Sequence, residues 1–214
     1  NWFIGEDPVA VNAFGTRRFY GPTRKERGQR CISCQYKNTC EYYFDITKPE
    51  YKALYLDCED IDGYFRDGCV FSDEINIYDS MSLNVNYSGG AMMSYSLTAH
   101  SPYEGYKLKI NGTGGRLEAE TFTGGTHDTY AGASANRLRV YNRKGEETII
   151  NVPIHYGSHG GADEVLQNLL FRGGDVPYNY MAGSGAGAMS LIIGAAANKS
   201  IKENTVIYVK DLLE

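Results

Sequence analysis

Apolar and polar residues alternate through four successive runs of the chain between Met81 and Thr121. In the first run, serine and asparagine alternate with Met81, Leu83, Val85 and Tyr87. Glycine-containing turns follow the first and third runs. A period of two places successive side chains on opposite faces of a strand, and glycine supplies the backbone freedom that tight turns need. The stretch therefore predicts an antiparallel meander with one buried face and one polar face.

The sequence around this meander predicts further strands on both sides and helices only after it. Short β-prone runs occur at 8–14, 137–140, 147–152 and 205–209. Residues 163–170 combine acidic residues in the first turn with an apolar stripe, which predicts a helix. A second helix is expected from about 184 to 197, with Asn198 as its C-cap. This order predicts an α+β fold with an open, mostly antiparallel sheet and helices packed on one face.

The chain has 214 residues and a net charge of −5, which disfavours a nucleic-acid partner. Its apolar runs are too short for a membrane span, so we expect no membrane association. We expect one domain over 1–214, with a cysteine-rich insertion at about 17–80. Five cysteines is an odd number, which favours a reducing, cytoplasmic setting. The sequence opens on Asn-Trp-Phe-Ile rather than methionine, so we expect a fragment or a processed chain.

The cysteines are the densest chemical signal in the sequence. Cys31 and Cys34 have two residues between them, a spacing that lets both bind one metal ion, and Cys40 follows six residues later. Either Cys58 or Cys69 would have to complete a tetrahedral thiolate site. We expect a structural zinc held by Cys31, Cys34, Cys40 and Cys69. The alternative is free buried cysteines or a single disulfide.

Two other motifs carry less specific information. The run from Gly183 to Ala188 has the letters of a dinucleotide fingerprint, but the residues before it read as a loop rather than a strand. We interpret these glycines as the start of a helix that packs closely. His155, His159 and Asp163 are spaced four residues apart, yet the surrounding proline and glycines predict a loop. Such a loop at the start of a helix can line a substrate site.

Several segments, in this order, resemble the C-terminal domain of the glucose–fructose oxidoreductase/inositol dehydrogenase-like (Gfo/Idh/MocA) family. The opening residues 1–11 look like the join to the first strand of that domain. The stretches 94–106 and 111–118 are the most family-like. The cysteine segment at 31–42 and the glycine–histidine loop at 157–163 resemble one branch of the family.

The resemblance implies the dihydrodipicolinate-reductase-like C-terminal fold, with the N-terminal Rossmann domain absent from this chain. Family members move a hydride between NAD or NADP and a sugar or cyclitol hydroxyl. The cofactor and the active-site lysine belong to the missing domain, so we expect no catalytic residue here and an inactive fragment. The second domain would bind the sugar-like substrate and form a homo-oligomer through the open sheet.

Tyrosine rings stack on sugars, and imidazole and hydroxyl groups bind sugar hydroxyls. The expected substrate-binding residues are therefore Tyr95, Tyr103, His155 and His159. The rival interpretation is a non-catalytic sheet module that binds carbohydrate or only mediates assembly.

Overall fold

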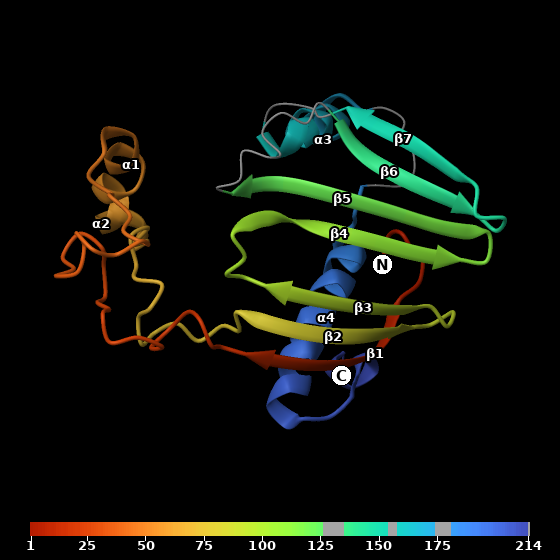
Figure 1. Cartoon of the computed structure of the whole chain (residues 1–214), viewed down its shortest axis with the longest axis horizontal. Helices are drawn as coiled ribbons and strands as arrows, with labels where there is room; N and C mark the ends of the chain where they lie inside the picture. Colours follow the sequence, from red (N-terminus) through yellow and green to blue (C-terminus); the bar gives the residue numbers. More distant parts are fainter. Residues whose placement is uncertain (126–134, 154–157, 174–180, 214) are drawn as a thin grey trace. The chain divides into compact units, whose positions relative to one another are not determined.

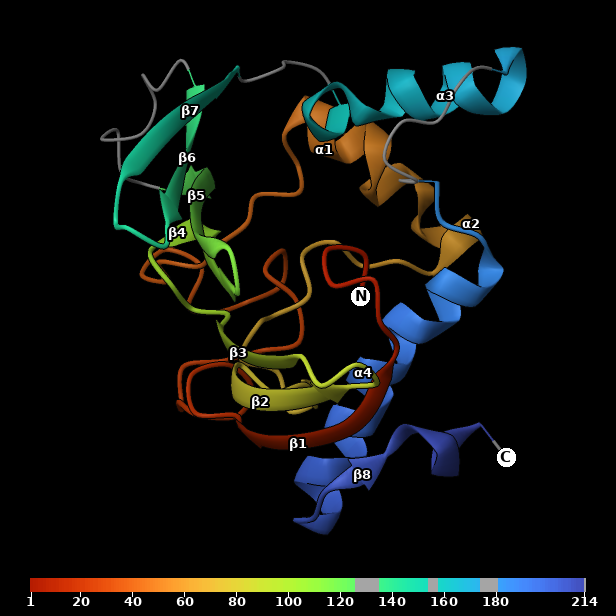
Figure 2. The same ribbon diagram turned by 90° about the vertical axis from the view of Figure 1, so that its right-hand side faces the viewer.

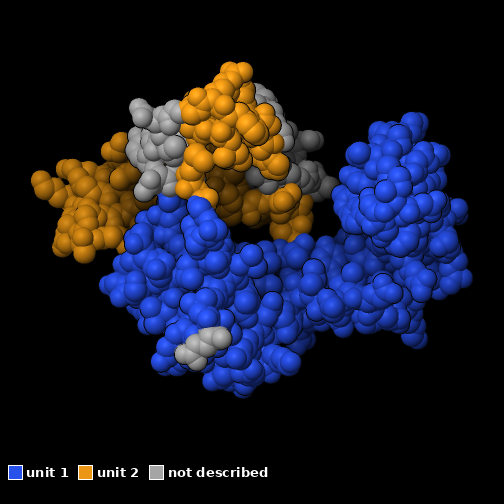
Figure 3. Space-filling view, turned by 180° about the vertical axis from the view of Figure 1, so that it is seen from behind, with its two compact units in different colours: residues 1–100, 183–214 blue, residues 101–182 orange. Residues whose placement is uncertain are grey.

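The computed structural model describes residues 1–125, 135–153, 158–173 and 181–213. These residues form two compact units (Figure 3). The first unit contains residues 1–100 and 183–214, and the second contains residues 101–182. The expected single domain over 1–214 stays a prediction.

The first unit is built on a four-stranded antiparallel sheet with the order β3-β2-β1-β8 (Figure 1). Its strands are β1 (Pro8–Thr16), β2 (Ser80–Tyr87), β3 (Met92–Thr98) and β8 (Ile207–Tyr208). The long helix α4 (Ser184–Glu203) packs against β1, and the short 3-10 helix η5 (Val209–Leu212) ends the unit (Figure 2).

The core of this unit lies between the sheet and α4. Val11 and Val85 are opposite each other on β1 and β2, and both are buried, as is Ala196 of α4. Because side chains alternate along a strand, the residues between the buried ones lie on the opposite face of the sheet. This face carries the uncharged side chains of Ala10, Asn12, Phe14, Thr16, Ser80, Ser82, Asn84, Asn86, Met92, Ser94, Ser96, Thr98 and Tyr208. We call this surface the outer face.

A buried hydroxyl joins α4 to β1. The backbone N–H of Ala13 donates to Ser200 Oγ at 2.9 Å, and this hydroxyl donates to the carbonyl of Thr205 at 2.5 Å. The expected C-cap at Asn198 is wrong. The helix continues for another turn, in which Ile201 packs against the core. It ends at Glu203, and Asn204 is the C-cap in a left-handed conformation with φ of 52°.

A long insertion separates β1 from β2 and contains all five cysteines. Its regular elements are the short helices α1 (Pro49–Leu54) and α2 (Glu59–Asp62), with the 3-10 helix η1 (Leu56–Cys58) between them. At the end of the insertion, Asp79 Oδ2 accepts hydrogen bonds from the backbone N–H groups of Arg18, Phe19 and Tyr20 at 2.7–3.0 Å. The buried carboxylate of Asp79 thereby ties the start of the insertion to its end.

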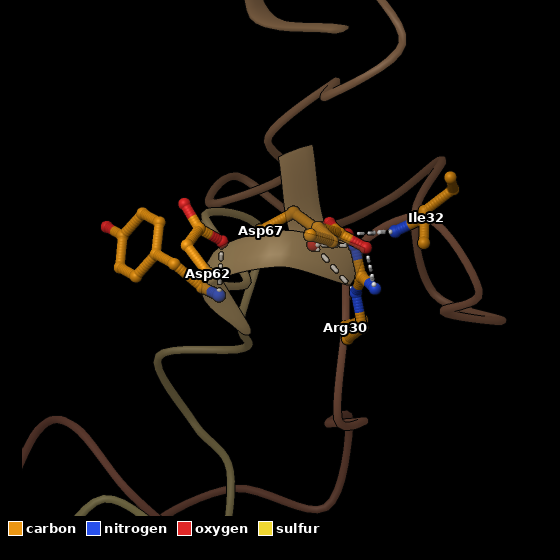
Figure 4. Close-up of polar contacts among 6 residues, drawn as sticks. Arg30, Ile32, Asp62 and Asp67 are labelled. Atoms are coloured by element: carbon orange, nitrogen blue, oxygen red, sulfur yellow. Dashed lines mark hydrogen bonds and ion pairs between the residues drawn. The ribbon is translucent and has the colours of Figure 1, made fainter. Parts of the chain in front are cut away.

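A second buried carboxylate organises the interior of the insertion. Asp67 Oδ1 accepts from Arg30 Nε at 2.8 Å, and its Oδ2 accepts from the backbone N–H of Ile32 at 2.9 Å (Figure 4). The same guanidinium bonds both carboxylate oxygens of Glu59. The side-chain hydrogen bond with Glu59 is the largest cause of the raised pKa of Arg30, so this cation is firmly charged.

The second unit contains a four-stranded antiparallel sheet with the order β4-β5-β6-β7. Its strands are β4 (Tyr103–Gly112), β5 (Gly115–Gly125), β6 (Ala135–Asn142) and β7 (Glu147–Pro153). The 3-10 segment η3 (Ser158–Gly161) leads into helix α3 (Ala162–Arg172).

The expected α+β class with open antiparallel sheets is confirmed. The four alternating runs do not form one meander, however, because β2 and β3 pair in one sheet and β4 and β5 pair in the other. The backbone N–H of Ala99 bonds the carbonyl of Asp79, and Pro102, which has no N–H, precedes β4. Within the described ranges, no helix is long and apolar enough to cross a membrane.

The carboxylate of Asp79 should carry much of the stability of the first unit. Burial on its own raises the pKa of this carboxyl, but its hydrogen bonds with Phe19, Tyr20, Ser80 and Arg18 outweigh burial and lower the pKa. We expect Asp79→Ala to cost about 3 kcal/mol in urea unfolding, because three partly buried N–H groups lose a charged acceptor. Asp73→Ala, which removes an exposed carboxylate paired with Arg27, should cost less than about 1 kcal/mol.

The pH dependence of this difference follows from the direction of the pKa shift. Because the folded-state pKa lies below the unfolded value of about 3.9, the stabilisation is complete above that pH. It is lost as the pH falls towards the folded-state pKa. The gap between wild type and Asp79→Ala should therefore narrow as the pH falls below about 3.9, and a gap that stays constant or widens as the pH falls would contradict this account.

Candidate functional site

The strongest candidate site in the second unit is an imidazole–carboxylate pair at the start of α3. His159 Nδ1 lies 2.8 Å from Asp163 Oδ1 and 3.0 Å from Oδ2. The side chain of His159 is 80% exposed. A carboxylate that accepts a proton from Nδ1 fixes the tautomer and leaves Nε2, on the far side of the ring, as an acceptor. The pair therefore offers a positioned hydrogen-bonding group to a ligand.

The backbone beneath this pair is strained. His159 has φ of 50°, a value that residues other than glycine rarely adopt. Gly160 and Gly161 follow with φ of 66° and 84°. Three successive left-handed residues turn the chain sharply before α3 begins at Ala162. Strain of this kind costs roughly 1–3 kcal/mol at each non-glycine position and is typical of functional sites. Glycine at 160 and 161 confines the cost to the histidine.

The other expected substrate residues are spread over the chain. His155 lies outside the described residues. Tyr103 begins β4 in the second unit and is partly exposed. Tyr95 belongs to the first unit, where it pairs with Leu83 across β2 and β3. Their grouping into one substrate site therefore stays a prediction.

Tyr95 lies on the inner, apolar face of its sheet, not on the polar outer face. Its ring is 45% exposed because it lines a hollow of about 430 Å³ between the sheet and α4. Tyr87, Met93, Ile193 and Ile201 also line this hollow. Pockets for small ligands commonly enclose about 300–1,000 Å³ and are mostly apolar with a few polar groups.

The cysteines of the insertion converge, but not as a metal site. Cys31, Cys34, Cys40 and Cys69 all line one small cavity of about 20 Å³, whereas Cys58 does not. In the described part of the chain, no group of three or more histidine, cysteine or acidic side chains is arranged to hold a metal ion. The structure thus does not support the expected structural zinc. A physical reason is that Arg24 Nη2 donates to Cys40 Sγ at 3.1 Å, so that a cation of the protein already faces this sulfur.

Some polar groups were not predicted from the sequence. His100 Nε2 lies 3.4 Å from Ser80 Oγ, which donates to Asp79 Oδ1 at 3.0 Å. The ring of His100 stacks on Phe19 with centroids 4.6 Å apart. This chain of contacts fastens the insertion to the sheet. Only proximity in space reveals it, because the sequence holds no spacing signal that joins residues 19, 79 and 100.

The glycines from 183 to 187 open a helix, as expected. Gly183 is the N-cap of α4, which starts at Ser184. A Cβ atom added at Gly183, Gly185 or Gly187 would meet no other atom of the structure within 4 Å. The described residues thus supply no close packing partner for this part of the helix, in contrast to our interpretation of the sequence.

Comparisons with known proteins point to oxidoreductases. No protein-family model matches the chain. The curated Bacillus subtilis protein named "Putative oxidoreductase YteT" is 34% identical over 230 residues, an alignment that covers 100% of this chain and 54% of the relative. The chain therefore spans about half the length of this relative.

Solved structures share the fold at low identity. An Agrobacterium radiobacter oxidoreductase in complex with NAD⁺, L-tartaric acid and magnesium gives a TM-score of 0.52 at 12% identity, over 96% of this chain and 44% of that chain. The aldose–aldose oxidoreductase of Caulobacter crescentus, complexed with glycerol, gives 0.50 at 14% identity, over 95% and 42%. At this identity, the likeness shows the fold alone.

The strained turn before α3 predicts opposite effects for one substitution at two glycines. Gly161→Ala should destabilise the chain by about 1 kcal/mol, because alanine must adopt a left-handed conformation there. Gly187→Ala places the same methyl group on a helix with open space around it and should stabilise by up to about 1 kcal/mol. Urea unfolding followed by far-UV circular dichroism measures both. Equal effects at the two sites would argue against strain at residue 161.

Proposed function

We propose that this chain binds the sugar or cyclitol substrate of an NAD(P)-dependent oxidoreductase. The premise is that the chain belongs to the glucose–fructose oxidoreductase/inositol dehydrogenase-like (Gfo/Idh/MocA) family and has the fold of its C-terminal domain. The observation that carries the proposal is the His159–Asp163 pair on its strained turn. The family supports the reaction class, and the pair supports a role for this chain in holding a substrate hydroxyl.

The chemistry of the pair suits a polyol. Asp163 holds the imidazole through Nδ1, so Nε2 accepts the proton of a substrate hydroxyl and orients its oxygen. A hydrogen bond to a partly desolvated hydroxyl contributes about 1 kcal/mol. In the first unit, the hollow beside Tyr95 offers an aromatic surface to the apolar face of a sugar ring.

The nicotinamide cofactor is assigned to the rest of the parent protein. The described strands of both sheets pair antiparallel, whereas the dinucleotide-binding fold uses parallel strands joined by crossover helices. These residues do not fit the cofactor, so we assign this chain no step of hydride transfer. Its own part is to bind and orient the substrate.

Kinetics of the whole parent protein test this function. His159→Gln should raise KM for the sugar about fivefold, because an oriented acceptor worth about 1 kcal/mol is lost while the cofactor site is untouched. Asp163→Asn should have a smaller effect in the same direction. Asp211→Asn, the same exchange on an exposed residue of η5, is the matched control and should leave the kinetics unchanged.

Two outcomes would contradict the proposal. Unchanged kinetics in His159→Gln would remove the role of the pair. Turnover of NAD(P) with a sugar panel by the isolated 214-residue chain would overturn its assignment as a binding half. A parent that binds sugar but has no NAD(P)-linked activity would favour the rival function, a non-catalytic carbohydrate-binding module.

The outer face of the first unit supports a second role, in homo-oligomer formation. A surface without charged side chains is inexpensive to desolvate, and charged residues are depleted at the centres of protein interfaces. Phe14 and Met92 on this face are 65% and 83% exposed, so they are available as apolar contacts. We propose that a second copy of the chain packs here.

A charge introduced into this face should disrupt the oligomer. Ser82 lies between Phe14 and Ser96 in the register of the sheet, so Ser82→Arg places a cation at the centre of the face. Light scattering after size-exclusion chromatography should show a smaller species than for wild type. Ala53→Arg on the exposed surface of α1 adds the same single charge elsewhere and is the control. A wild-type chain that is monomeric at tens of micromolar would contradict the proposal.

A further inference from the structure

The thiol-lined cavity of the insertion shares no residue with the proposed substrate site and has its own chemistry. Its backbone is held by a short antiparallel contact, in which Cys31 N–H bonds the carbonyl of Asp67 at 2.9 Å and Cys69 N–H bonds the carbonyl of Gln29 at 2.8 Å. This contact brings Cys69 to the segment that contains the other three cysteines. The Arg30–Asp67 ion pair holds the two segments together.

The four sulfurs are free and partly exposed. Cys34 N–H bonds the carbonyl of Cys31 at 3.1 Å, which forms a turn with two residues between the cysteines. The cavity of about 20 Å³ holds about one water-sized group. A small oxidant can therefore meet several thiols at one place.

Cys40 differs from its neighbours because a guanidinium donates to its sulfur. Arg24 Nη2 lies 3.1 Å from Cys40 Sγ, and the guanidinium carbon lies 3.5 Å from the centre of the Phe71 ring. Arg27 and Lys37 also line the cavity. Reactive cysteines are typically found in such electropositive, partly exposed surroundings, because a nearby cation stabilises the attacking thiolate.

We propose that Cys40 is a peroxide-reactive thiol and that a second cysteine of the same cavity resolves its oxidised form. The Cys40 thiolate attacks one oxygen of a hydroperoxide, the O–O bond breaks, and the alkoxide or hydroxide that leaves takes up a proton. The sulfenic acid of Cys40 is then attacked by a second thiolate. The S–O bond breaks, water leaves, and a disulfide forms, so that two thiols are oxidised for each peroxide reduced.

Cys31 is a suitable resolving residue. Burial raises the pKa of its thiol, so Cys31 is a poor first nucleophile towards peroxide. Its Sγ lies 4.0 Å from the carbonyl of Tyr42, within the same loop as Cys40. Cys58, outside the cavity, is the internal reference for ordinary thiol reactivity.

Thiol counting with hydrogen peroxide tests the proposal on the 214-residue chain. Wild type treated with one equivalent of peroxide should lose two of its five thiols. Peptide mapping should find Cys40 in the new disulfide, and dimedone present during oxidation should label Cys40. Cys58→Ser should also lose two thiols, whereas Cys40→Ser should lose none at the same dose.

The role of the guanidinium is tested by two further variants. Arg24→Gln should slow the oxidation about tenfold, and Arg24→Lys should restore part of the rate because it keeps a cation. Circular dichroism of each variant checks that it is folded. Equal reactivity of Cys58 and Cys40, or oxidation that persists in Cys40→Ser, would overturn the proposal. So would one equivalent of metal that co-purifies with the chain and protects the thiols.

Discussion

The carboxylate of Asp79 is the contact on which the arrangement of the first unit depends. Its Oδ2 accepts hydrogen bonds from three successive backbone N–H groups just after β1, and its Oδ1 accepts one from the Ser80 hydroxyl at the start of β2. An insertion of about sixty residues with little regular structure is thus closed at its neck by one buried anion. The β1–β2 register continues undisturbed beyond this neck, from Thr16 opposite Ser80 to Ala10 opposite Asn86. The sheet and the insertion therefore meet at a fixed point, although they are stabilised by different interactions.

Strain is concentrated elsewhere, at His159. His159 has a positive φ and is largely exposed, and the carboxylate of Asp163 and the two left-handed glycines that follow accompany this conformation. This combination is typical of a side chain kept in place for contact with a ligand. The cysteine cavity is organised differently. Arg24 donates to Cys40, Arg30 pairs with Asp67, and the bridge between Arg30 and Gly68 holds the two backbone segments together. A binding function and a thiol function can therefore occupy different parts of one chain without sharing residues.

Much of the fold could be predicted from residue pattern, because alternation and helical spacing are local. The strands of both sheets and helices α3 and α4 follow the expected segments. The pairing of β4 with β5 in a separate sheet could not be predicted, since the same alternation suits either arrangement. Tyr95 shows the same limit: its period places it with Leu83 and Met93, but only the position of α4 decides that it lines a hollow. Sequence spacing grouped Cys31, Cys34 and Cys40 but left the fourth cysteine open between Cys58 and Cys69. It could not reveal the guanidinium at Cys40 either, because that contact depends on packing against Phe71.

The central claim, that this chain presents His159 to a sugar hydroxyl, is tested most directly by NMR of its histidine side chains during sugar titration. The chain has four histidines, and the signals of His159 are assigned by their loss in His159→Gln. A panel of hexoses and inositols should contain at least one sugar that shifts the ring signals of His159 in a saturable manner, with His100 unaffected. The account is contradicted if a sugar turned over by the parent protein leaves the His159 signals unchanged at saturating concentration.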